Sequence, residues 1–111
     1  MSRARWHILR EEGAVTLARH LPARFDVAAT TRLAPVRMVP LAHQIRQDLW
    51  RALQRLRGFS PVVRIVAVPG GLHVIAGGRL DHAGPRAVIE ARVQEVLDHA
   101  GNRTRWTRWA Q

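Results

Sequence analysis

The clearest hydrophobic pattern in the chain has the three- and four-residue spacing of an amphipathic helix. Leu41, Ile45, Leu49 and Leu53 recur at this spacing and fall on one helical face. A proline at position 40 is tolerated in the first turn, because its missing N–H would have no partner there. The glycine at position 58 can adopt the left-handed conformation that ends a helix. These features predict a helix over residues 40–57.

A second helical pattern covers residues 85–100, with a proline at its start and a glycine directly after it. Its apolar positions are Val88, Ile89, Val93, Val96, Leu97 and Ala100. The two helices enclose a β-hairpin. Residues 62–68 are β-branched and residues 72–76 pair back on them, because Pro69-Gly70-Gly71 reverses the chain. Residues 25–33 alternate apolar and polar, which is typical of a half-buried strand.

The N-terminal part of the chain allows two interpretations. Residues 14–21 fit a short helix stopped by Pro22, whereas Glu11-Glu12-Gly13 could turn a hairpin that includes residues 6–9. Both lead to an α+β fold in one compact domain over residues 1–111. We expect a two-layer sandwich, with two long amphipathic helices on a small antiparallel or mixed sheet of three to five strands. A winged helix, with residues 16–33 as helix-turn-helix, is the competing fold, but Pro22 in the turn argues against it.

The net charge says more about possible binding partners than the rest of the composition does. The 111 residues carry 18 Arg, no Lys and 8 acidic residues, a formal net charge of +10. Such an excess attracts polyanions. The absence of Cys excludes disulfides, thiol nucleophiles and thiolate metal sites. No apolar run approaches the roughly 20 residues of a membrane span and the N-terminus lacks a secretion signal. We therefore expect a soluble, cytoplasmic protein.

The C-terminal segment 102–111 repeats Thr-Arg-Trp in tandem, so it is either a basic Trp/Arg tail or a final helical turn. Arginine pairs with phosphate and tryptophan stacks on unpaired bases, which favours nucleic-acid contact by Arg103, Arg105, Trp106, Arg108 and Trp109. Packing of both tryptophans against the sheet is the structural alternative, because they lie three residues apart. Contact with a membrane or a protein partner is a further possibility.

The predicted central helix carries a ridge of arginines at Arg46, Arg51, Arg55 and Arg57. Such a ridge could follow a phosphate backbone, although a solvated helix face has the same composition. Trp50 flanks the apolar stripe and is expected at the edge of the core. Gly77-Gly78-Arg79 only weakly suggests a phosphate-binding loop, since the P-loop pattern and its lysine are missing.

No catalytic or metal-binding pattern appears. The six histidines lack ligand spacing, and the two serines lie outside any nucleophile motif. We therefore expect neither enzyme activity nor a cofactor. The Gly-x-x-Gly loop of KH domains and the aromatic strand motif of RRM domains are also missing. The sequence favours a small basic protein, nucleic-acid-binding or regulatory, that contacts DNA or RNA phosphates through the nine residues of the ridge and the tail. The alternative is an adaptor or small accessory subunit that docks an acidic protein.

Overall fold

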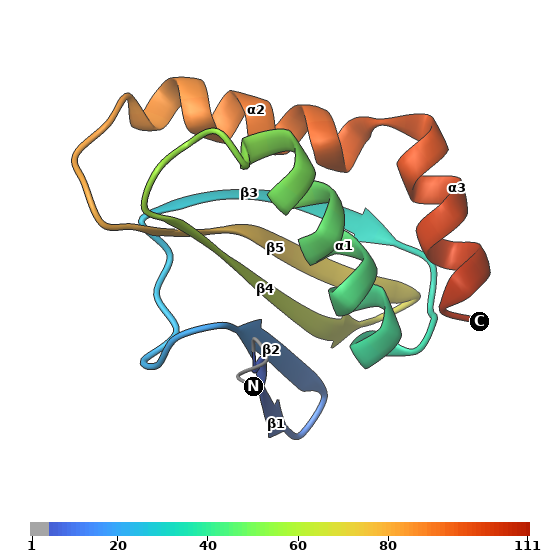
Figure 1. Cartoon of the computed structure of the whole chain (residues 1–111). Helices are drawn as coiled ribbons and strands as arrows, with labels where there is room; N and C mark the ends of the chain where they lie inside the picture. The colour runs from blue at the N-terminus through green and yellow to red at the C-terminus, as the bar shows by residue number, and fades with distance from the viewer. Residues whose placement is uncertain (1–4) are drawn as a thin grey trace.

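The computed structural model describes residues 5–111, so residues 1–4 of the predicted domain lie outside the described residues. The fold is α+β, as predicted: a five-stranded antiparallel sheet packed by three helices (Figure 1). The strand order is β1-β2-β4-β5-β3. The elements are β1 (His7–Glu11), β2 (Ala14–Ala18), β3 (Val27–Leu33), α1 (Met38–Leu53), β4 (Phe59–Val68), β5 (Gly71–Leu80), α2 (Arg86–Asp98) and α3 (Ala100–Trp109).

The core lies between the helices and one face of the sheet. The strand register places four buried residues in one row across four strands: Leu17, Val63, Ala76 and Ala29. The apolar stripes of α1 and α2 pack against this face, and α1 crosses β4 and β5 while α2 runs along β3 (Figure 1). The helical periodicity identifies the buried helix faces at most positions, but Val88 in the first turn of α2 and Ala100 beyond its end are exposed and do not belong to the predicted stripe. Within residues 5–111, no helix combines the length and the hydrophobicity that a bilayer crossing requires.

The N-terminal hairpin is present, and the alternative helix over residues 14–21 is wrong. β2 pairs with β1 on one side and with β4 on the other. All five of its residues are buried, so it lacks the alternation by which a half-exposed strand is recognised. The winged-helix alternative is also wrong, because residues 27–33 form an edge strand of the sheet.

Helix ends differ from the prediction at two places. α1 ends at Leu53, so Arg55 and Arg57 lie in the following turns. Leu56 packs against the core from one of those turns, which extends the apolar periodicity beyond the helix. α2 ends at Asp98 because His99 has extended backbone angles, with φ −65° and ψ 117°. The His99 ring then accepts a hydrogen bond from Asn102 N–H and begins α3 as its N-cap.

The edge strand β3 is bonded to side chains of α2. Its alternate residues direct their backbone groups away from β5. Glu90 Oε2 accepts a hydrogen bond from Ala28 N–H at 2.9 Å, and Gln94 Nε2 donates one to the Thr30 carbonyl at 3.1 Å. Two side chains on one face of α2 thus provide hydrogen-bond partners for outward backbone groups of β3.

Candidate anion-binding site

The C-terminal segment is a structured helix, and it buries one of the residues predicted to contact nucleic acid. Trp106 is fully buried, and its indole Nε1 donates a hydrogen bond to Asp48 Oδ2 of α1 at 2.5 Å. Arg105 is hydrogen-bonded to the same carboxylate oxygen. Because neither face of its ring is exposed, Trp106 offers no surface on which a base could stack, and this expectation is corrected.

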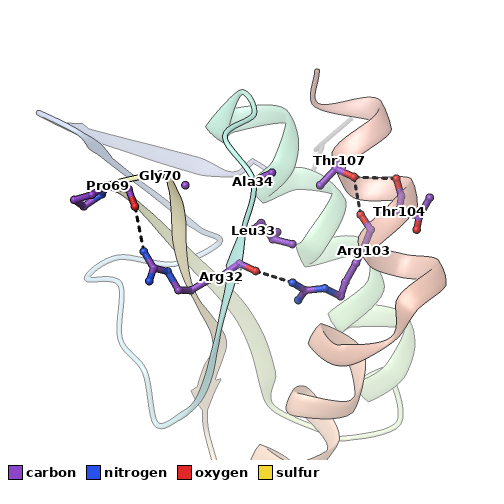
Figure 2. A pocket seen from close by; sticks show the side chains of 9 residues that line it. Arg32, Leu33, Ala34, Pro69, Gly70, Arg103, Thr104 and Thr107 are labelled. Carbon is purple, nitrogen blue, oxygen red and sulfur yellow. Dashed lines mark hydrogen bonds between the residues drawn. The ribbon is translucent and has the colours of Figure 1, made fainter.

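Arg103 is also committed to contacts within the protein. Its guanidinium donates hydrogen bonds to the Arg32 carbonyl at 2.6 Å, to Thr31 Oγ1 at 2.7 Å and to the Leu97 carbonyl at 3.1 Å. Figure 2 shows Arg103 and Arg32 at the rim of a cavity of about 570 Å³, where Arg32 in turn donates to the Pro69 carbonyl. Both guanidinium groups are already hydrogen-bonded to other parts of the fold, so this cavity is a poor candidate for an anion-binding site.

The remaining predicted residues are more accessible. Arg108 and Trp109 lie on the outer side of α3, and the Trp109 side chain is 64% exposed. Arg51 is exposed and lies 3.8 Å from Asp48. With Arg55 and Arg92 it lines a groove of about 550 Å³ where the end of α1 meets α2, and we call this the α1–α2 groove. Arg57 is exposed nearby in sequence and is not among the lining residues of that groove.

Arg46 belongs to a different and larger cavity at one end of the sheet. This sheet-end cavity has a volume of about 750 Å³. Its lining residues come from the segments next to β1 and β2, from α1, and from the ends of β4 and β5: Trp6, Arg19, His20, Leu21, Arg46, Trp50, Gly58, Phe59, Ser60, Pro61, Arg79 and Asp81. The antiparallel register explains this gathering, because β2 and β5 end where β1 and β4 begin.

Two guanidinium groups in the sheet-end cavity have buried donors without partners. Neither Arg46 Nε nor Arg79 Nε makes a hydrogen bond to any described residue. The Arg46 guanidinium lies over the Trp6 ring, with Cζ 4.6 Å from the ring centroid. Buried polar atoms normally have a partner, and an unpaired donor calls for an explanation such as a ligand. An anion in the cavity would supply acceptors for both groups.

The electrostatics of the cavity are positive. Burial lowers the pKa of Arg46 from its ordinary value, and burial together with the Arg46 charge lowers the pKa of His43, one turn earlier on α1. Both shifts mark an environment that disfavours an additional uncompensated cation. Asp81 is the only carboxylate among the lining residues, against three arginines. The pKa of Arg24 is raised chiefly by its hydrogen bond to Asp26, and the Asp81 charge is the smallest contribution to this shift.

Gly78 makes room for the aromatic wall of this cavity. A Cβ at this position would lie 2.3 Å from the Ser60 carbonyl oxygen and 2.7 Å from the Phe59 ring. Only a residue without a side chain therefore allows Phe59 to pack here, next to Arg79. The sequence offered the Gly77-Gly78-Arg79 signal as a weak phosphate loop. The structure instead uses these glycines for close packing and places Arg79 at the cavity.

Of the predicted residues, the sheet-end cavity contains Arg46 alone. Trp6 and Arg19 were missed, and Arg79 was noted only within the weak phosphate-loop signal, because no local motif connects residues so far apart in the chain. The described residues contain no group of three His, Asp or Glu side chains arranged to hold a metal ion. Comparison with protein-family models, curated proteins and solved structures finds no match to this chain.

Proposed function

We propose that this protein binds nucleic acid through arginine–phosphate contacts on the surface around the second half of α1. The observation that carries the proposal is the pair of buried, unpartnered Nε groups of Arg46 and Arg79 in one positive cavity. Phosphate is the anion that guanidinium groups recognise with two parallel hydrogen bonds. The proposal requires no catalytic group.

The distribution of charge supports this function. Within residues 5–111, ion pairs engage only four arginines, namely Arg24, Arg51, Arg64 and Arg105. Several carboxylates serve the fold, as Asp48 does between α1 and α3 and Glu90 does at β3. The other arginines within residues 5–111 make no ion pair, so most of the positive charge there is not neutralised by a bonded carboxylate. Such a surface binds polyanions in a salt-dependent way.

The α1–α2 groove extends the basic surface beyond the cavity. Trp50 lines the sheet-end cavity, and the next residue, Arg51, lines the groove with Arg55 and Arg92. A phosphate backbone that crosses α1 at Trp50 meets arginines on both sides. Arg57, Arg108 and Trp109 are exposed and keep their predicted role as candidate contacts. An acidic protein surface is the alternative partner for the same arginines.

Fluorescence anisotropy with labelled DNA and RNA oligonucleotides tests the proposal. We expect binding at low salt that weakens strongly between about 50 and 200 mM NaCl. The double variant Arg51→Gln/Arg55→Gln should reduce the slope of log K against log salt, since fewer phosphates are neutralised. Arg10→Gln is the control, because Arg10 lies beside the β1–β2 turn, at the opposite end of these strands from the cavity.

Absence of binding to any oligonucleotide at 50 mM NaCl would overturn the proposal. Equal losses for the Arg10 control and the double variant would show that net charge alone attracts the polymer, with no defined site. Stoichiometric capture of an acidic protein that nucleic acid does not displace would favour the adaptor alternative.

A further inference from the structure

We propose that the sheet-end cavity holds one unpaired nucleotide, with the base stacked on Trp50 and the phosphate bound by Arg46 and Arg79. This inference rests on the proposed function. It adds that the protein binds single-stranded nucleic acid more tightly than a duplex of the same sequence.

The Arg46 side chain is arranged in advance for a phosphate. Its guanidinium lies over the Trp6 ring, which fixes the plane of the group and adds a cation–π attraction. Stacking occupies a face of the guanidinium, whereas its N–H donors point outward in the plane. One of these donors, Nε, is already buried without a partner. No hydrogen bond to a described residue engages this Nε, so a phosphate that binds Arg46 has no bond at that atom to displace.

Arg79 supplies a second donor to the cavity from the sheet. It lies on β5 directly opposite Ser60 of β4, while Arg46 comes from α1. Its Nε is buried and unpartnered like that of Arg46. Two guanidinium groups on different elements surround an anion better than a run of exposed arginines on one helix, because each is held by its own scaffold. Arg19, exposed at the rim, adds a third positive charge.

Trp50 is the side chain in this cavity that can stack on a base. It lies one helical turn after Arg46, so both project toward the same side of α1. The ring is 53% exposed, which makes it one of the most exposed large apolar residues described. Trp6, by contrast, has Arg46 over its ring and packs partly against the core. Trp6 is therefore a positioning residue for Arg46, and Trp50 is the stacking surface.

The preference for single strands follows from the role of Trp50 as the stacking surface. In a duplex both faces of every internal base are covered by neighbouring bases, so no base can stack on Trp50 until it is unpaired and turned outward. A single strand offers bases without this cost. The volume of about 750 Å³ lies in the range of small-molecule pockets and allows a nucleotide to enter.

The test compares a single-stranded oligonucleotide with the duplex of the same sequence, at equal salt. Trp50→Ala should weaken single-strand binding roughly tenfold and leave duplex binding unchanged, because only the stacked base is lost. Trp50→Phe should restore most of the affinity. Val88→Ala is the control, since it also truncates an exposed apolar side chain and lies outside the cavity and the proposed contacts. Wild-type tryptophan fluorescence should be quenched by the single strand, and Trp50→Phe should remove most of that change.

Arg46→Gln and Arg79→Gln should each weaken single-strand binding more than the Arg10→Gln control does. Trp6→Ala should resemble Arg46→Gln, with its fold checked by circular dichroism. Equal wild-type affinity for single strand and duplex, with no effect of Trp50→Ala, would overturn the nucleotide subsite and leave phosphate binding in place. Failure of both polymers to bind at low salt would overturn the proposed function and this inference with it.

Discussion

The carboxylate of Asp48 accepts a hydrogen bond from the indole nitrogen of the fully buried Trp106, at 2.5 Å. The two residues lie 58 positions apart and join α1 to α3. Arg105 is bonded to the same carboxylate, so one acidic side chain satisfies both a buried N–H and a cation. This contact explains why the first Thr-Arg-Trp repeat is part of the fold.

Asp48→Ala should destabilise the protein by about 2–3 kcal/mol, because the buried indole N–H loses a charged acceptor and finds no water. Glu95→Ala is the control: it removes the same charge from an exposed position of α2. Urea unfolding monitored by circular dichroism measures both variants. Equal stabilities of the two variants would show that the Asp48–Trp106 bond contributes nothing beyond charge.

The tandem repeat supplies a matched pair of tryptophan variants. Trp106→Ala should cost about 3–5 kcal/mol, because it opens a large cavity in the core. Trp109→Ala, three residues later, should change stability by less than about 0.5 kcal/mol, since its side chain is 64% exposed. Thermal unfolding separates the two outcomes. Similar losses for both variants would contradict the burial described for α3.

Gly78→Ala should destabilise the protein by about 1–3 kcal/mol, because the new methyl group overlaps the Ser60 carbonyl and the Phe59 ring. Gly84→Ala is the control: the nearest atom to its Cβ, in Ile89, lies at an ordinary 3.6 Å. Gly78→Ala should also weaken oligonucleotide binding, since Phe59 lines the sheet-end cavity. Full stability of Gly78→Ala would show that this close packing can relax.

His43 should make stability depend on pH. Its pKa in the fold lies below the ordinary 6.5, chiefly because of burial and secondly because of the Arg46 charge. The unfolded chain therefore binds the proton more readily. The contribution of His43 is fully present above pH 6.5 and is lost as the pH falls through the lower pKa of the folded state.

His43→Gln should reduce the loss of stability between about pH 7 and pH 5, measured by urea unfolding at each pH. Arg46→Gln should reduce it in part, because the smaller cause of the shift is removed. An unchanged pH profile in His43→Gln would show that other histidines account for the acid sensitivity.

Local patterns predicted the elements that are local in the chain. The apolar stripe of α1 and the hairpin around Pro69-Gly70 depend on residues that are close in the sequence, and both are present. The break at His99 was predicted two residues too late, because the glycine at position 101 indicated the end of the second helix, whereas that glycine lies in the first turn of α3. β2 was ambiguous for a different reason: all five of its residues are buried, so no apolar–polar alternation marks it as a strand.

The candidate site was predicted only at Arg46. The neighbours of Arg46 come from the first and the last strand along the chain. Trp6 directly precedes β1, whereas Arg79 lies near the end of β5. Only the strand order brings them together, and a sequence pattern does not encode that order directly. The tail was misread at Trp106 because a spacing of three residues does not tell which of two tryptophans faces the core.

The bonds that α2 and α3 make to β3 have a consequence for self-association. The Ala28 N–H and the carbonyls of Thr30 and Arg32 already have side-chain partners, so three outward groups of this edge are unavailable to a strand from another chain. Among the described residues, β1 is the sheet edge whose outward backbone groups make no such bonds to side chains. Two copies joined at β1 would each leave only β3 as a free edge, where three outward groups are already bonded, so the addition of a third copy and growth into a fibril would be disfavoured.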